Sequence, residues 1–161
     1  VAGMALVAAG YGVALAVPWL RPVFDDGRLG DAGAAGLLWI ALVRIPVGTV
    51  LLEEVAFRGV LPGLFGADAR WRWGPVLAAS SLFGAWHILP SMALHQNAAV
   101  DAALGTASAA VIPILAVMAS GAAGVGLCLV RHTGRGLLAP ALVHVATNSG
   151  GVLFAWLASH P

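Results

Sequence analysis

The sequence predicts an all-α fold: a polytopic bundle of about five transmembrane helices, forming one membrane domain over residues 1–161. The chain is 60% hydrophobic, with a mean hydropathy of +0.93. Only 9% of its residues are charged, whereas a soluble domain carries about 25%. Apolar runs recur at about the 20-residue length that a helix needs to cross a bilayer. These observations exclude a soluble fold, and a net charge of +1 gives no basic surface for nucleic acid.

The first two predicted spans flank a polar loop. Residues 1–20 are apolar and lack the charged start typical of a signal peptide, so we interpret them as a membrane helix. The loop at residues 21–31 holds three Asp and two Arg. The second run, residues 34–65, is too long for one perpendicular span. We expect it to tilt, to bend near Pro46, or to continue past the bilayer.

Three further spans follow a short basic loop. The third covers residues 74–94, and we expect its helix to break at Pro90, just after His87. The fourth and fifth cover residues 105–130 and 136–158. Small residues crowd these last two spans, and small side chains let membrane helices approach closely. The chain therefore predicts one compact bundle surrounded by lipid.

The distribution of arginine predicts the orientation of the bundle. Five spans place the N-terminus and the loops at residues 68–73 and 131–135 on one side. By the positive-inside rule, the side richer in arginine is cytoplasmic. A composition rich in alanine, with arginine in place of lysine, hints at a GC-rich bacterial genome. We therefore expect a bacterial cytoplasmic membrane with the N-terminus inside. The loop arginines on the two sides are Arg70, Arg72, Arg131 and Arg135 against Arg21 and Arg28.

Two adjacent acids and an arginine lie within the second apolar run. Each ionisable group at membrane depth costs at least about 2.5–3.5 kcal/mol, so such groups mark function by default. Glu54 and Arg58 are spaced i,i+4 with the acid first, the favoured order for an ion pair. Glu53 points about 100° away on the helix, which favours a general base facing a reaction centre. The alternative is a structural ion-pair cluster that locks helices together.

Two histidines lie at depths similar to that of Glu53. The helical rise puts Glu53, His87 and His144 at ~18, ~20 and ~12 Å from the cytoplasmic side. His144 and Asn148 share a helix face at i,i+4, so they could donate hydrogen bonds to an oxyanion, or His144 could bind a metal. The alternatives are a core histidine at His87 and a polar clasp between helices at His144.

These residues form three motifs that resemble those of the CPBP family of intramembrane proteases. That family includes type II CAAX prenyl endopeptidases and bacteriocin-processing and self-immunity proteins. The motifs occur in the family's order, each on a separate predicted helix, and the resemblance covers a catalytic core of about residues 50–150. The motifs are Glu53-Glu54-x-x-x-Arg58, Phe83-x-x-x-His87 and His144-x-x-x-Asn148.

The resemblance implies an endopeptidase that acts on a peptide or membrane-protein substrate, with a cavity that opens toward the cytoplasm. It implies that Glu53 activates water with help from His87. It also implies that His144 and Asn148 stabilise the oxyanion, while the Glu54–Arg58 pair supports the site. Relatives generally have more than five spans, so we expect a short member or one lacking an N-terminal portion.

The metal dependence stays open at this point. The chain has no H-E-x-x-H motif, and asparagine is a poor zinc ligand, which favours metal-free activation of water. The Glu53, His87 and His144 set remains chemically adequate for a single divalent ion such as zinc. Cys128 is the single cysteine, which excludes a disulfide framework and a cysteine metal motif.

Other functions use some of the same residues. A rhomboid-like serine protease would pair Ser120 with His144, but it expects glycine where this chain has Met118, and it leaves the acids unused. A proton-coupled transporter, or a scaffold or immunity factor, could use the polar cluster without catalysis. A single cluster and the lack of an inverted repeat argue against transport. Arg44 could bind a substrate carboxylate, although snorkelling to the interface is its ordinary role.

Overall fold

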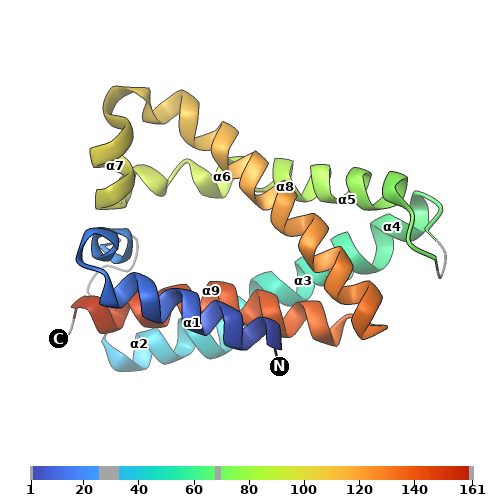
Figure 1. Ribbon diagram of the computed structural model, residues 1–161, viewed down its shortest axis with the longest axis horizontal. Helices are drawn as coiled ribbons and strands as arrows, with labels where there is room; N and C mark the ends of the chain where they lie inside the picture. Colours follow the sequence, from blue (N-terminus) through green and yellow to red (C-terminus); the bar gives the residue numbers. More distant parts are fainter. Residues whose placement is uncertain (1, 26–32, 68–69, 160–161) are drawn as a thin grey trace.

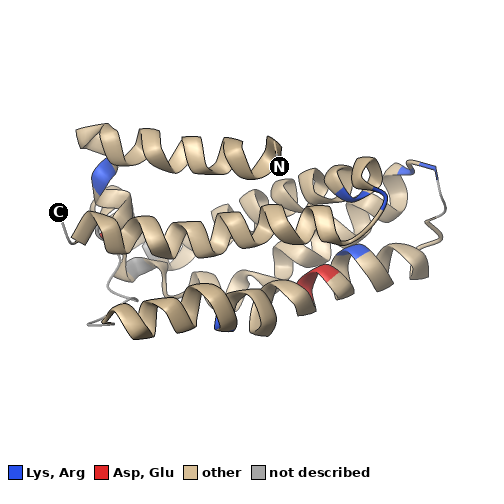
Figure 2. Ribbon diagram, turned by 90° about the horizontal axis from the view of Figure 1, so that it is seen from below, with Lys and Arg blue, Asp and Glu red and all other residues tan. Residues whose placement is uncertain are grey.

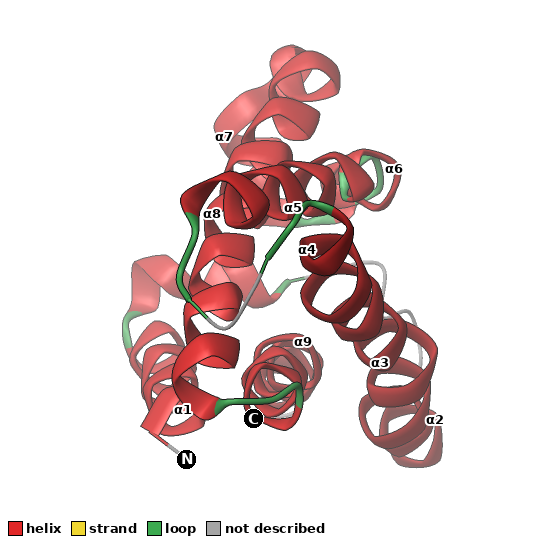
Figure 3. Ribbon diagram, turned by 90° about the vertical axis from the view of Figure 1, so that its right-hand side faces the viewer, coloured by secondary structure: helices red, strands yellow, loops and turns green. Residues whose placement is uncertain are grey.

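The computed structural model describes residues 2–25, 33–67 and 70–159. Every regular element in these ranges is helical, which confirms the all-α prediction (Figures 1 and 3). Many large apolar side chains point outward, as expected of a bundle whose solvent is lipid. Arg28 and most of the predicted polar loop lie outside the described residues.

The first helix is shorter than the predicted span of residues 1–20. Helix α1 (Ala2–Ala16) ends before Pro18, where the chain bends by 113° into a 3-10 helix, Pro18–Phe24. Proline disfavours the helical conformation in the residue before it, and Val17 is accordingly extended with φ −91° and ψ 114°. The aromatic rings of Tyr11, Phe24 and Phe154 then hold the bent segment against the last helix of the chain.

The second apolar run forms one long helix. Helices α2 (Ala34–Trp39), α3 (Leu51–Glu54) and α4 (Leu61–Leu64) are parts of a single 31-residue candidate span, Ala34–Leu64. The helix passes Pro46 without stopping. Figure 2 shows an acidic turn on this helix and, next along the same helix, a basic turn.

Wide helical turns connect these α-helical parts. The segments Ile40–Arg44, Pro46–Val50 and Val55–Val60 are π-helical. A π turn bonds i to i+5, so it accommodates Pro46, whose ring would clash with the carbonyl of an α-helix. Glu53 and Glu54 lie on the short α-helical part between two such turns. Local widening of this kind is frequent at functional sites.

The third predicted span breaks earlier than expected. Helix α5 (Trp73–Trp86) has 14 residues, and His87 leaves the helical region with φ −84° and ψ 0° before α6 (Ile88–Ser91) begins. The predicted break at Pro90 was therefore three residues too late along the chain. A proline ring clashes with the carbonyl of residue i−4, here Trp86, so the helix ends one turn upstream of the proline.

The remaining helices complete the bundle. Helix α7 (Ala98–Leu104) is short, whereas α8 (Ser108–Gly134) and α9 (Leu138–Ser159) are long. Among the described residues, three helices are long and apolar enough to span a membrane, or four if α1 and its bent extension form one span. The polytopic bundle is thus confirmed, while the predicted count of about five spans stays a prediction, since α5 has 14 residues and is too short for this criterion.

Close helix contacts hold the polar centre in place. Helix α8 packs against α5 and crosses it obliquely, and α1 lies beside α9 (Figure 1). A Cβ atom at Gly84 would lie 2.5 Å from the carbonyl oxygen of Val117, and one at Gly124 would lie 3.1 Å from Ser80 Cβ. Glycine at these two positions therefore lets α5 and α8 approach backbone to backbone. Gly124 lies in the fourth span, where small residues were noted, whereas Gly84 lies in the third.

Candidate active site

The centre of the bundle is polar and its outside is apolar. Arg58 and Glu54 are each 1% exposed and are among the largest fully buried side chains. Leu51 and Leu52, on the same helix, are more than half exposed. Burying a leucine side chain inside the bundle is not favoured by the hydrophobic effect when the surroundings are lipid. Exposing an unpaired charge to lipid, in contrast, costs several kcal/mol. The second apolar run therefore turns its charged face inward.

Glu54 and Arg58 form the ion pair that the sequence predicted. Arg58 Nη1 lies 3.0 Å from Glu54 Oε1. The guanidinium also stacks on an aromatic ring of α5, with Cζ 3.9 Å from the centroid of Phe83. A cation over an aromatic face is attracted by the ring quadrupole, and the attraction is stronger away from water. The pair thus ties the acid-bearing helix to α5.

Glu54 has a second partner that the sequence analysis did not predict. His144 Nδ1, on α9, lies 2.7 Å from Glu54 Oε1, the oxygen that also binds Arg58. A carboxylate oxygen accepts, so Nδ1 carries the proton and Nε2 is the nitrogen turned toward the rest of the site. Asn148 Nδ2 lies 3.3 Å from that Nε2. The two residues predicted to share a helix face are therefore in contact.

The two carboxylate oxygens of Glu53 have different surroundings. Oε1 accepts a hydrogen bond of 2.9 Å from the indole Nε1 of Trp86. Oε2 lies 3.6 Å from His144 Nε2, beyond ordinary hydrogen-bond length, and is buried without a hydrogen-bond partner among the described residues. Oε2 is thus the oxygen free to meet a water molecule or a substrate group.

Trp86 was missed by the sequence analysis, which gave it no role. An indole N–H donates and cannot accept, so it suits a buried carboxylate. Trp86 occupies the last variable position of the second motif, directly before His87, and only that position could have drawn attention to it. Nothing in the spacing indicates that its ring reaches a residue on another helix.

His87 lies at the end of α5, where its ring contacts Phe83. Its Nδ1 lies 2.8 Å from the carbonyl oxygen of Phe83, and the two rings meet edge to face at 4.6 Å. A carbonyl only accepts, so Nδ1 carries a proton and Nε2 of the neutral ring offers a lone pair. The ring of His144 packs against the same Phe83 at 5.8 Å. The rings of both histidines therefore contact the ring of Phe83.

The ionisable residues do not form a metal centre in the described part of the chain. No group of three or more His, Cys, Asp or Glu side chains there has the geometry to hold a metal ion. His144 has Glu54 at Nδ1 and Asn148 at Nε2, and the Nδ1 of His87 bonds a carbonyl. The donors suggested for zinc, namely Glu53, His87 and His144, do not fit such an ion in this arrangement.

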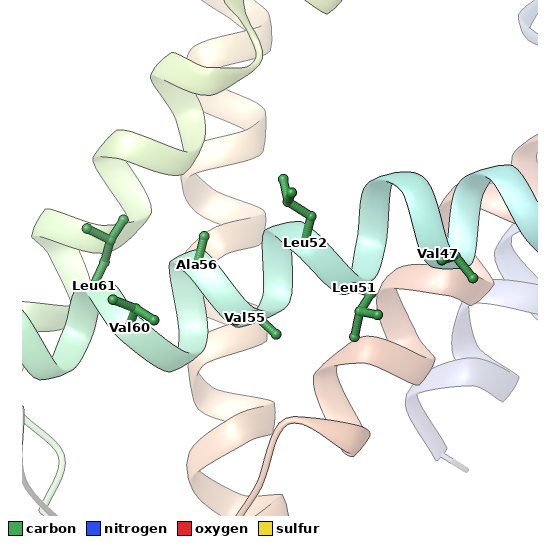
Figure 4. Close-up of a pocket in the computed structure, with 7 residues that line it drawn as sticks. All are labelled: Val47, Leu51, Leu52, Val55, Ala56, Val60 and Leu61. Carbon is green, nitrogen blue, oxygen red and sulfur yellow. The ribbon is translucent and has the colours of Figure 1, made fainter.

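A shallow groove runs along the outer side of the acid-bearing helix (Figure 4). It has a volume of about 670 Å³ and none of the ionisable residues lines it. The side chains that line it are all apolar, so lipid chains can fill it as they cover the rest of the outer surface. The lining residues are Val47, Leu51, Leu52, Val55, Ala56, Val60 and Leu61.

Comparison with known proteins gives one match. Residues 35–150 match the family described as type II CAAX prenyl endopeptidase, Rce1-like. The matched stretch contains all three motifs. No curated protein and no solved structure gives a significant match to the chain.

Proposed function

The chain belongs to the Rce1-like family of type II CAAX prenyl endopeptidases, and on that premise we propose that it cleaves peptide bonds with water activated by Glu53. One observation supports this proposal above the others. Glu53 Oε2 is buried, has no hydrogen-bond partner among the described residues, and lies 3.6 Å from His144 Nε2. An acceptor of this kind can bind a water molecule and remove its proton.

The first step is attack by water on the scissile carbonyl. Water donates one hydrogen bond to Glu53 Oε2, and Glu53 takes that proton as the oxygen bonds to the carbonyl carbon. His87 Nε2 accepts the second hydrogen of the water and helps to orient it. This role uses the ring nitrogen left free by the bond from Nδ1 to Phe83. The carbonyl π electrons move to oxygen, which becomes the oxyanion.

The oxyanion is stabilised by donors on α9. His144 can donate from Nε2 only as an imidazolium, because Nδ1–H is already bonded to Glu54. Glu53, Glu54 and Arg58 carry a formal charge of −1 together, so one added proton on His144 makes the buried group neutral and leaves Glu53 as the carboxylate that accepts the proton of water. Asn148 supplies the second donor from its amide nitrogen, as in other oxyanion sites.

The second step expels the amine. The oxyanion collapses to a carboxyl group, the C–N bond breaks, and Glu53 returns the proton to the leaving nitrogen. Glu54, Arg58 and Phe83 hold the imidazole and the acid-bearing helix at fixed positions throughout. Geometry held by packed residues in this way is what a preorganised site needs.

The substrate we propose is a peptide or a membrane protein that approaches within the bilayer. The polar site is surrounded by apolar helices, so a segment reaching it leaves bulk water. We propose that the site opens toward the cytoplasm, as the resemblance implied, and that no metal takes part, since the donors do not fit one.

Cleavage by the purified protein in nanodiscs tests the proposal. The substrate is a quenched fluorescent peptide library, and wild type is compared with Glu53→Gln. Asp101→Asn is the matched control, since Asp101 is an exposed acid on α7. We expect cleavage by wild type and by the control, loss of cleavage in Glu53→Gln, and no effect of a chelator.

Each other result has a definite meaning. Cleavage that survives in Glu53→Gln would remove Glu53 from this role. Loss of activity with chelator, restored by zinc, would contradict the metal-free step. Absence of cleavage by every folded preparation would contradict the peptidase proposal and favour a scaffold or transport function.

A further inference from the structure

We propose that Trp86 is a positioning residue for the reaction. Its indole N–H holds one oxygen of Glu53 so that the other oxygen, Oε2, faces the reacting water. This inference rests on the proposed function, because it assigns a role within the same site. Trp86 stands at a variable position of the second motif, so it is not one of the residues that define the motifs.

The contact joins two separate helices. Trp86 is the last residue of α5, and its Nε1 donates to Glu53 Oε1 on α3 at 2.9 Å. Phe57, one turn beyond Glu53, packs against the indole with ring centroids 6.1 Å apart. The indole is thus held by a ring from the same helix whose carboxylate it binds.

A carboxylate without such a partner has little to fix its direction. The last torsion of a glutamate is broad and nearly two-fold, so its two oxygens interchange easily. The indole has one donor and no acceptor, so it binds one oxygen and leaves the other to the site. His144 Nε2 lies 3.6 Å from Oε2, so the free oxygen is the one beside the proposed oxyanion donor.

The two partners of this hydrogen bond differ in exposure. Trp86 is 51% exposed, whereas Glu53 is 4% exposed. Here the ring is half outside while its polar atom points inward to the acid. The part of the Trp86 side chain that reaches the interior is therefore its hydrogen-bond donor, the indole N–H.

The decisive variant keeps the shape of the ring and removes the donor. Trp86 is replaced by phenylalanine, or by β-(3-benzothienyl)alanine, in which sulfur takes the place of the N–H. Trp39→Phe is the control, since Trp39 is exposed on α2, away from the site. We measure kcat and KM in nanodiscs, together with the thermal midpoint.

We expect both Trp86 replacements to lower kcat by about tenfold or more, because the lost bond was made to a charged group. KM should change by less than about twofold, since the indole does not bind the substrate in this proposal. The Trp39 variant should match wild type. A benzothienyl protein that keeps wild-type kcat would overturn the proposal, even if the phenylalanine variant does not fold.

A second measurement does not depend on activity. In protein labelled with ¹⁵N at the indole nitrogens, the Trp86 N–H resonance should shift in Glu53→Gln and stay in place in Asp101→Asn. An unshifted Trp86 resonance would overturn the contact itself. Activity that persists in Glu53→Gln would instead refute the proposed function, so the two failures can be told apart.

Discussion

His144 Nδ1 and Glu54 Oε1, 90 residues apart in the sequence, lie 2.7 Å from each other. The same oxygen accepts a hydrogen bond from Arg58 Nη1 at 3.0 Å. One carboxylate oxygen therefore joins α9 to the acid-bearing helix while it neutralises a buried arginine. Glu54 therefore orients the imidazole while it pairs with the arginine, and a carboxylate orients a histidine in the same way in the catalytic triads of hydrolases.

Glu54→Gln should be strongly destabilising. The change removes the direct ion-pair partner of the buried Arg58, and breaking a buried pair costs about 3–5 kcal/mol. Replacing both partners, as Glu54→Gln with Arg58→Met, should recover much of that loss, because no charge is then stranded. Thermal unfolding in detergent measures both variants. A double variant that is less stable than the single one would contradict this account.

Asn148→Ala should lower kcat by roughly 10²–10³ with a small change in KM, the effect of losing one oxyanion donor. Thr147→Ala is the control, because Thr147 precedes Asn148 on the same helix and its hydroxyl bonds only within that helix. Steady-state kinetics in nanodiscs check the difference. Equal kcat in the two variants would rule out the oxyanion role of Asn148.

His87→Asn should separate the structural and the chemical roles of that ring. An asparagine amide can replace the Nδ1 donor that bonds Phe83, but it has no lone pair comparable to that of Nε2. We expect a thermal midpoint near that of wild type and a kcat lower by roughly 10²–10⁴, the usual contribution of general acid–base groups. A kcat within tenfold of wild type would make His87 a packing residue.

Gly84→Ala should disturb the contact between α5 and α8. The added Cβ would lie 2.5 Å from the backbone carbonyl oxygen of Val117, and backbone cannot move aside cheaply. We expect a loss of about 1–3 kcal/mol in the free energy of unfolding. Gly126→Ala on α8 is the control, because its Cβ would meet nothing within 4 Å. A Gly84 variant as stable as the control would show that the helices are not packed this closely.

Much of the local chemistry could be predicted because it depends on helix geometry alone. The Glu54–Arg58 pair and the contact of His144 with Asn148 both follow from i,i+4 spacing, which any helix brings together. The all-α fold likewise follows from apolar runs that must satisfy their backbone hydrogen bonds internally. These predictions needed no knowledge of which helices are neighbours.

The exact course of the helices was harder to predict. The helix breaks at His87, about one turn before the predicted position at Pro90. A proline disfavours helix in the residues before it, so it predicts the region of a break and not the exact residue. The bend at Pro18 shortened the first predicted span for a similar reason. The wide turns that carry the helix past Pro46 have no clear sequence signal, since several backbone paths can accommodate a proline.

The sequence by itself determined that the chain is a membrane bundle of helices, that its buried charges are few, and which pairs meet within one helix. The tertiary structure alone decided that Glu54 binds His144, that Trp86 binds Glu53, and that Phe83 lies between the two histidines. These contacts join residues on different helices. Their formation depends on how closely whole helices approach one another. Small residues such as Gly84 control that distance, and the spacing of residues within one helix does not predict it.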